Sequence, residues 1–306
     1  MRLVPVLCFV LFLFACKPQT HPALVFQTDF GLKDGAVSAM KGVAYSISPN
    51  LAIFDLTHEI PAYNIWEAAY RLEQTARYWP AGTVFVSVVD PGVGSERKSV
   101  VLKTKSGHYF VTPDNGTLTL VANSLGIAEV REIDEAVNRR KGSGKSYTFH
   151  GRDVYAFTGA RLAAGVISFE SVGPVLPAEV VRIPFNGPQF KAGALSGGIP
   201  ILDVQYGNVW TNIDDSTFNQ LGVKAGDLLD VAMLRGDSLV YHDTIPFANT
   251  FSAVPSGAAL AYLNSLLQLS FAINMGDFSA KYKVYSGPDW KVDVKKILPL
   301  RDDQGR

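Results

Sequence analysis

Three short polar segments carry the residues of this chain that could do chemistry. They are Thr28 to Gly31 (TDFG), Asp90 to Arg97 (DPGVGSER) and Phe149 to Asp153 (FHGRD). Asp29 and Asp90 each come directly after a strand-like apolar run, at 23–28 and 83–89. In an open α/β sheet, ligands bind at the carboxyl ends of parallel strands, where both acids would share one edge. The sequence therefore predicts a ligand site at this edge of the sheet.

Each of these segments has a functional and a structural interpretation. Asp29 could accept two hydrogen bonds from a ribose diol, or it could cap the helix that follows. The glycines between Asp90 and Arg97 could bring these two side chains together at a ligand, or form a structural turn with a surface ion pair. His150 has no second histidine at ligand spacing, which disfavours a zinc site and leaves a purely structural histidine open.

A fourth segment, GNVWTNID at 207–214, places Trp210 among amide side chains. Trp210 with Asn208 and Asn212 could form a surface for a purine, because the ring can stack and the amides can hydrogen bond. Alternatively, Trp210 covers the core of a small β domain. The residues alone leave both interpretations open.

The elements that would position these segments alternate between strand and helix. Strand-like runs at 23–28, 51–57 and 83–90 are separated by helical patterns at 34–47 and 64–78. Strands that alternate with helices of this length indicate βαβ units. The sequence therefore predicts an N-terminal α/β domain with a mainly parallel sheet over residues 23–182.

The second half of the chain has a different pattern. Residues 183–194 are rich in proline and glycine and lack periodicity, which predicts a linker. Short β-rich runs separated by turn signals follow over 195–300. They predict a smaller C-terminal antiparallel domain that is a β-barrel-like unit or a sandwich. The predicted fold class is therefore α/β with an added β domain.

Composition limits the possible partners and redox chemistry. The chain has 306 residues, with 28 Lys and Arg against 28 Asp and Glu, so nothing in its charge favours a nucleic acid or an anionic membrane. Its two cysteines, Cys8 and Cys16, both precede the first strand. The folded part can therefore form neither a disulfide nor a thiolate metal site, and no metal is expected.

The N-terminus resembles a targeting segment. Residues 3–15 form an unbroken apolar run that is too short to cross a bilayer as a helix. The sequence Leu-Phe-Ala before Cys16 is similar to a bacterial lipobox, which predicts a lipoprotein signal peptide at 1–15, lipidation of Cys16 and a tether at 16–22. A cleaved signal without lipid and an uncleaved anchor are the alternatives. The expected location is the bacterial cell envelope, with membrane contact through the N-terminal lipid only.

Taken in order, the motifs resemble one family. TDFG, DPGVGSER, TPDNG at 112–116, FHGRD and GNVWTN look like those of the S-adenosyl-L-methionine (SAM) hydroxide adenosyltransferases, relatives of the fluorinase and chlorinase enzymes. The resemblance runs from Ala23 to the 280s. It implies an N-terminal α/β domain and a C-terminal β domain in a homotrimer, with each active site between one subunit's first domain and its neighbour's second.

The resemblance also implies a role for each matching position. Asp29 matches a carboxylate that binds the ribose diol, Asp34 one near the methionine end, and Asp90, Arg97 and His150 the set around the attacking water. In the second domain, Asp203 matches a contact to the methionine amino group, Asn208 and Trp210 the adenine and methionine surroundings, and Phe251 an adenine-stacking ring. Phe149 and Gly151, which flank His150, count as substrate-binding positions.

The nucleophile is implied by the pair His150-Gly151. The halogenating relatives have Tyr-Ser there, and the serine helps to bind halide, so His-Gly implies hydroxide. The expected reaction is hydrolysis of SAM to adenosine and L-methionine through attack of an activated water on ribose C5′, with SAM as substrate and no cofactor. Either Asp90 or His150 could take the proton. A lipid-anchored adenosine- or SAM-binding protein without catalysis is the main alternative, and a metal-dependent phosphoesterase using Asp29, Asp34 and Asp90 is a third.

Overall fold

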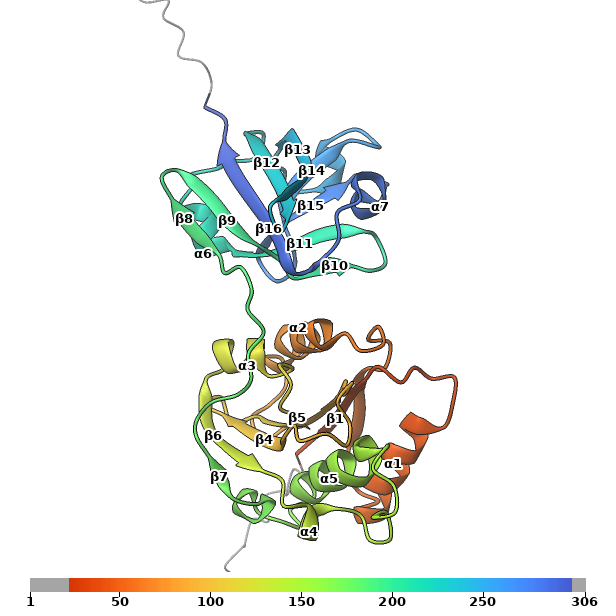
Figure 1. The fold of residues 1–306 in the computed structure, drawn as a ribbon. Helices are drawn as coiled ribbons and strands as arrows, with labels where there is room; N and C mark the ends of the chain where they lie inside the picture. The colour runs from red at the N-terminus through yellow and green to blue at the C-terminus, as the bar shows by residue number, and fades with distance from the viewer. Residues whose placement is uncertain (1–21, 299–306) are drawn as a thin grey trace, which may run out of the picture.

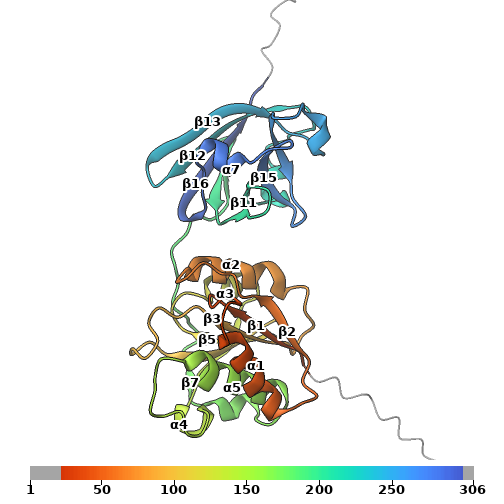
Figure 2. The same cartoon turned by 90° about the vertical axis from the view of Figure 1, so that its right-hand side faces the viewer.

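A computed structural model describes residues 22–298 of the chain. Figures 1 and 2 show two bodies joined by one extended segment. The first body contains β1 (Leu24–Thr28), α1 (Ala36–Ile47), β2 (Ile53–Thr57), α2 (Ile65–Ala76), β3 (Val84–Val88), β4 (Ser99–Thr104), β5 (Tyr109–Pro113), α3 (Thr119–Ser124), β6 (Ile127–Glu132), α4 (Glu135–Asn138), the π-helical turn η1 (Gly151–Ala156), α5 (Phe157–Ala163), the 3₁₀ turn η2 (Phe169–Val172) and β7 (Val175–Leu176).

These strands form one seven-stranded sheet in the order β2-β1-β3-β5-β4-β6-β7. Strands β2, β1, β3 and β5 run parallel, while β4, β6 and β7 pair antiparallel. The predicted α/β class with a mainly parallel sheet is confirmed. The turn at Ser106-Gly107 joins β4 and β5 as a hairpin, which places an antiparallel extension beside the parallel strands.

Helices cover both faces of this sheet. Alternate residues of a strand point to opposite faces, so Leu24 and Phe26 of β1 belong to one buried cluster and Val25 to another. The first cluster includes Met40 of α1 and residues of η1 and α5, and the second includes Leu72 of α2 together with α3. The carboxyl ends of β1 and β3 therefore lie at one edge of a sheet that is fixed from both sides.

The second body contains β8 (Gln189–Lys191), β9 (Ala194–Ile199), β10 (Ile201–Asp203), β11 (Asn208–Asp214), α6 (Asp215–Asn219), β12 (Leu228–Arg235), β13 (Ser238–Pro246), the 3₁₀ turn η3 (Phe251–Ala253), β14 (Ala259–Leu263), β15 (Gln268–Ile273), α7 (Phe278–Tyr282) and β16 (Gly287–Lys296). Its strands form a four-stranded sheet, β10-β11-β15-β14, and a five-stranded sheet, β13-β12-β16-β9-β8.

All pairings within these two sheets are antiparallel, as predicted, and one buried cluster joins them. The barrel-like closure is not observed: neither sheet closes on itself among the described residues. An isolated parallel bridge between Phe247, just after β13, and Ala261 of β14 links the two sheets, which enclose a shared core. Short alternating strands are common to barrels and sandwiches, so the sequence pattern cannot distinguish them.

The two bodies touch through the indole of α2. Trp66 Nε1 donates to the Pro200 carbonyl oxygen at 2.9 Å, and the Trp66 ring lies 5.5 Å from that of Phe185. The predicted boundaries, 23–182, 183–194 and 195–300, stay a prediction. Within residues 22–298 the structure has no helix with the length and apolar character that a membrane crossing would require. The predicted signal peptide, 1–15, and the lipidation site Cys16 lie outside the described residues.

Candidate active site

A cavity of about 240 Å³ lies where β1 and β3 end. It brings together all three polar segments that the sequence singles out, although they are far apart in the chain. The residues that line it are Asp29, Phe30, Ala62, Tyr63, Val88, Asp90, Val93, Thr148, Phe149, His150 and Gly151. The expectation that Asp29 and Asp90 share one edge of the sheet therefore agrees with the structure.

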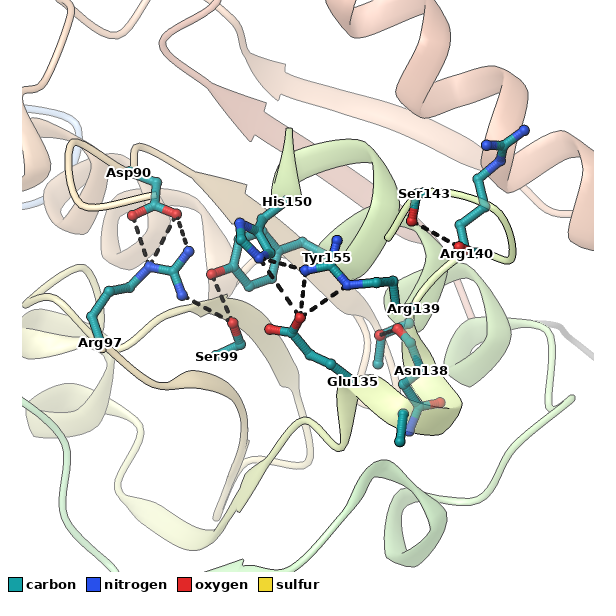
Figure 3. Close-up of polar contacts among 12 residues, drawn as sticks. Asp90, Arg97, Ser99, Glu135, Asn138, Arg139, Arg140, Ser143, His150 and Tyr155 are labelled. Carbon is teal, nitrogen blue, oxygen red and sulfur yellow. Dashed lines mark hydrogen bonds and ion pairs between the residues drawn. The ribbon is translucent and has the colours of Figure 1, made fainter. Parts of the chain in front are cut away.

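Asp90 and Arg97 form a close ion pair beside this cavity (Figure 3). Arg97 Nε donates to the two carboxylate oxygens of Asp90 at 2.9 and 3.1 Å, and Nη2 donates to Oδ2 at 2.6 Å. The side chains are only 12% and 5% exposed. Burial alone would lower the pKa of Arg97, but the hydrogen bond to Asp90 and the nearby negative charges raise it. The guanidinium therefore stays charged and fixes the orientation of Asp90.

A buried phenol supports the far side of this pair. Arg97 Nη1 donates to Ser99 Oγ at 3.1 Å, and this hydroxyl lies 3.1 Å from the Tyr155 hydroxyl. The guanidinium carbon of Arg97 also lies 5.7 Å from the centre of the Tyr155 ring. Arg97 is thus held from two directions, which restricts the positions that Asp90 can adopt.

His150 is buried and comes directly before the π-helical turn η1. Its Nε2 lies 2.6 Å from Arg139 Nη2 and 3.6 Å from Glu135 Oε2, whereas Nδ1 is buried without a hydrogen-bond partner among the described residues. Burial lowers the pKa of His150, Arg139 lowers it further, and Glu135 acts in the opposite direction. His150 is therefore neutral at neutral pH in this structure. Figure 3 shows its ring between the Asp90–Arg97 pair and the Glu135–Arg139 pair.

Gly151 lets the aromatic wall of the cavity approach the backbone. A Cβ atom there would lie 3.2 Å from Phe30 Cζ and 3.2 Å from Val88 Cγ1, which is tighter than most Cβ contacts and would require these side chains to shift. Phe30 in turn contacts Phe149 edge-on, with the ring centres 5.8 Å apart. Gly151 therefore contributes space, and Phe149 contributes an apolar surface suited to a planar or sugar group.

The predicted ribose carboxylate lies in the cavity, while the predicted methionine-end carboxylate does not. Asp29 Oδ2 accepts a hydrogen bond from the backbone N–H of Tyr63 at 2.9 Å, and Tyr63 has a left-handed φ of 69°. Asp34 is exposed and is not among the lining residues; its Oδ1 accepts from the backbone N–H of Ala36 at the start of α1. Within this chain, therefore, Asp34 binds the backbone at the start of α1 and Asp29 faces the site.

A hydrogen-bonded chain holds the segment that carries Asp29. Thr28 Oγ1 lies 2.8 Å from His58 Nδ1, His58 Nε2 lies 3.0 Å from Asp55 Oδ1, and Lys41 Nζ lies 2.6 Å from Asp55 Oδ2. Burial alone would raise the pKa of Asp55, but its hydrogen bonds to Lys41 and His58 lower it. The loop after β1 is thereby tied to β2 and α1 directly beside Asp29.

The residues predicted in the second body gather around a different cavity. A cavity of about 590 Å³ is lined by Asn208 and Phe251, with Tyr206, Met275 and others beside them. Asn208 Nδ2 lies 3.3 Å from Asp203 Oδ2, and Trp210 lies in the same strand as Asn208. Every lining residue of this cavity lies between 205 and 277, and every lining residue of the first lies between 29 and 151. One chain therefore does not bring the two predicted groups into one cavity.

Several residues that contact the site belong to none of the predicted motifs. Glu135 and Arg139 lie against His150, Tyr63 contacts Asp29, and Tyr155 supports Arg97. The only available signal for Glu135 and Arg139 is their spacing of four residues, which is typical of a helical ion pair. Among residues 22–298, no group of three or more His, Cys, Asp or Glu side chains is placed to hold a metal ion.

Comparison with known proteins identifies the family. The SAM hydroxide adenosyltransferase N-terminal domain matches residues 24–173, and the C-terminal domain of the same family matches residues 197–291. The chain belongs to the SAM hydroxide adenosyltransferase family. The family and the enzyme class implied by the motifs are thus confirmed.

Individual relatives of this family match with substantial identity. An (R)-S-adenosyl-L-methionine hydrolase of Methanocaldococcus jannaschii is 48% identical over 143 residues, which are 45% of this chain and 52% of that protein. The hydrolase of the same name from Salinispora arenicola is 34% identical over 89% of this chain and 97% of its own length. A fluorinase of Nocardia brasiliensis is 30% identical over 90% and 97%. The crystal structure of an uncharacterised conserved protein from Thermotoga maritima superposes with a TM-score of 0.81 at 36% identity, covering 89% of this chain and 99% of that one.

The predicted location, a lipid-anchored lipoprotein of the bacterial cell envelope, is wrong by this comparison. The relatives that align over nearly their whole length are enzymes named for SAM hydrolysis or fluorination, and none of these names describes an envelope protein. The prediction depended on 13 apolar residues and one cysteine at the N-terminus. An apolar run and one cysteine resemble a targeting segment in residue pattern, but such a pattern alone does not determine where a protein acts.

Proposed function

We propose that this protein hydrolyses S-adenosyl-L-methionine to adenosine and L-methionine, with Asp90, Arg97 and His150 acting on the attacking water. The observation that supports these roles is that Asp90 and His150 line the cavity where β1 and β3 end and that Arg97 is paired with Asp90 beside it, in a member of the SAM hydroxide adenosyltransferase family. The residues of the second body, Asp203, Asn208, Trp210 and Phe251, are proposed to bind the adenine and methionine parts. No cofactor takes part in this proposal.

In this reaction the nucleophile, and not the leaving group, is the part that needs catalysis. Attack on ribose C5′ forms a C–O bond and breaks the C–S bond, and methionine departs as a neutral thioether that needs no proton. The water loses one proton, which finally passes to solvent. Bulk water is a very weak acid and a poor nucleophile, so a base that accepts its proton contributes roughly 10²–10⁴-fold. Holding the water in line with the C–S bond contributes up to about 7–11 kcal/mol.

Asp90 is the group that best fits the role of base. Arg97 carries only donors and cannot accept a proton. A carboxylate has about four lone-pair sites, and Arg97 makes three contacts with the Asp90 oxygens, so an acceptor site remains for a water. His150 Nε2 already faces Arg139 at 2.6 Å, which leaves Nδ1 as the ring nitrogen that can meet the water.

The assembly is part of the proposal. We infer that a homotrimer brings the cavity of one subunit's first body against the cavity of its neighbour's second. Two features support this: the two groups of predicted residues line separate cavities of one chain, and exposed apolar side chains, among them Met275 and Tyr206, border the second cavity. The domains proposed for this assembly are those predicted above, 23–182 and 195–300.

The experiment is incubation of the purified protein with the two sulfonium epimers of SAM in H₂¹⁸O, without added halide. Release of adenosine that carries the label in its 5′-hydroxyl, together with methionine, supports attack of water on C5′. The names of the hydrolase relatives lead us to expect turnover of the (R)-epimer. Stoichiometric binding of SAM without product would instead favour the binding-protein alternative. Light scattering on the same sample tests the trimer.

A further inference from the structure

The short helix α4 presents an ion pair to the catalytic histidine proposed above. Arg139 donates to Glu135 Oε2, with Nη2 at 2.5 Å and Nε at 3.1 Å. The same Nη2 lies 2.6 Å from His150 Nε2, and Glu135 Oε2 lies 3.6 Å from it (Figure 3). Arg139 is 11% exposed and also lies over the ring of Tyr147 at 4.8 Å, so its position is fixed by packing.

The hydrogen-bond donors of Arg139 determine which nitrogen of His150 carries the proton. A guanidinium has only N–H donors and no acceptor. A contact of 2.6 Å between Arg139 Nη2 and His150 Nε2 is therefore a hydrogen bond only if Nε2 offers its lone pair. The ring is then neutral with its proton on Nδ1, the nitrogen on the other side from Arg139.

We propose that Glu135 and Arg139 are positioning residues that hold His150 in its neutral Nδ1–H form, so that it donates to the attacking oxygen while Asp90 accepts the water's proton. This inference rests on the proposed function for its catalytic meaning. Arg139 selects the tautomer by direct contact. Glu135 holds Arg139 in place and offsets its charge.

Glu135 and Arg139 shift the pKa of His150 in opposite directions. If Nε2 carried a proton, it would repel Arg139 and turn toward Glu135, the carboxylate 3.6 Å away. Removing Arg139 therefore favours the Nε2–H form and raises the pKa of His150. Removing the charge of Glu135 leaves Arg139 uncompensated and lowers this pKa further. The other charged groups that face the ring, Arg97 and Asp90, oppose each other and are unchanged in both variants.

The test is ¹⁵N NMR of histidine-labelled protein as a function of pH, without substrate. The chain has five histidines, and His150→Gln identifies the signal of interest. We expect the wild-type signals of the Nδ1–H tautomer, a higher pKa in Arg139→Met and a lower pKa in Glu135→Gln. His242, which pairs with Asp230 on exposed strands, is the internal reference and should not move.

A matched control is available in the same domain. Glu129 and Arg131 form a pair at 2.5 Å with exposures of 36% and 13%, close to the 34% and 11% of Glu135 and Arg139. Glu129→Gln should leave the pKa of His150 and the turnover of SAM unchanged. Loosened packing alone would move the pKa of His150 in one direction in both variants, toward the value of an exposed histidine.

The activity measurement is separate from the NMR result. In Arg139→Met we expect kcat to fall roughly 10²-fold, the low end for a positioned proton-transfer group, with KM little changed and the acid limb of the pH profile moved to higher pH. An Nε2–H tautomer in the wild type, or shifts of the same sign in both variants, would overturn the proposal whatever the activity. If the pKa of His150 shifts in opposite directions in the two variants but the protein does not hydrolyse SAM, the role of the pair is supported and the proposed function is refuted.

Discussion

Replacing Asp90 with asparagine removes the charge of this carboxylate while keeping its shape. In the wild type, Arg97 makes three contacts of 2.6 to 3.1 Å with the two oxygens. Asparagine retains one oxygen, and its amide group places a donor against the guanidinium. Hydrogen bonds to charged groups contribute about 1.5–3 kcal/mol, and both side chains are largely buried, so we expect the free energy of unfolding to fall by about 2–3 kcal/mol.

The expected loss of activity is larger than the loss of stability. A base contributes roughly 10²–10⁴-fold, which corresponds to about 3–5 kcal/mol of transition-state stabilisation at 1.36 kcal/mol per decade. Urea denaturation measures the first quantity, and release of adenosine at saturating SAM, in the folded range of temperature, measures the second. Calorimetry should show that SAM still binds, because the contacts to adenine and methionine are unchanged.

An exposed aspartate–arginine pair provides the control. Asp289 accepts from Arg235 Nε at 3.0 Å, with exposures of 51% and 64%. Asp289→Asn should change stability by less than about 0.5 kcal/mol and leave turnover unchanged. If Asp90→Asn hydrolysed SAM at a rate within a few-fold of the wild type, Asp90 would not be the base and the mechanism above would be refuted.

Three further results are expected. Gly151→Ala should lower stability by about 1–3 kcal/mol and reduce turnover, because its Cβ would lie 3.2 Å from two side chains, whereas Gly187→Ala, with nothing within 4 Å, should do neither in the same thermal and kinetic assays. Trp66→Phe should lower the free energy of unfolding by about 0.5–1.5 kcal/mol, since it removes the hydrogen bond to Pro200 between the two bodies. A denaturation midpoint equal to that of the wild type would contradict this. The pKa of His150 is lowered in the folded state, mainly by burial, so the unfolded chain binds more protons just below pH 6.5 and stability should fall as the pH drops there. His150→Gln should flatten that dependence in a pH series of melting curves, and an unchanged slope would rule out His150 as its source.

The edge of the sheet that carries the site could be predicted from sequence because strand ends are local features. Asp29 and Asp90 each follow an apolar run, and parallel pairing of β1 and β3 brings the two ends together. Asp90 and Arg97 lie only seven positions apart on either side of a glycine-containing turn, so their contact is a short-range feature. These predictions depend on periodicity and on short-range geometry, which a single sequence contains.

The environment of His150 could not be predicted in the same way. Arg139 reaches the ring only because β6 and β4 pair and deliver α4 to the same edge, a result of long-range register. Asp34 shows the opposite case: the family resemblance implies a substrate contact, but within one chain its carboxylate accepts from the backbone N–H of Ala36 and is not among the residues that line the cavity. Which side chains from different elements contact one another depends on tertiary packing. The type of a single residue does not predict these contacts.

Because Gly151–Ala156 forms a π-helical turn, the orientation of His150 depends on the number of residues in this turn. An α-helix advances by about 100° per residue, so deletion of one residue here would let a regular helix form and rotate everything before it by about that angle. His150 would then swing away from both ion pairs while the packed residues of α5 kept their places. Deletion of one residue within this turn would thus leave the sheet folded but move the His150 imidazole out of the site. At this turn, activity could be lost or changed in evolution without loss of the fold.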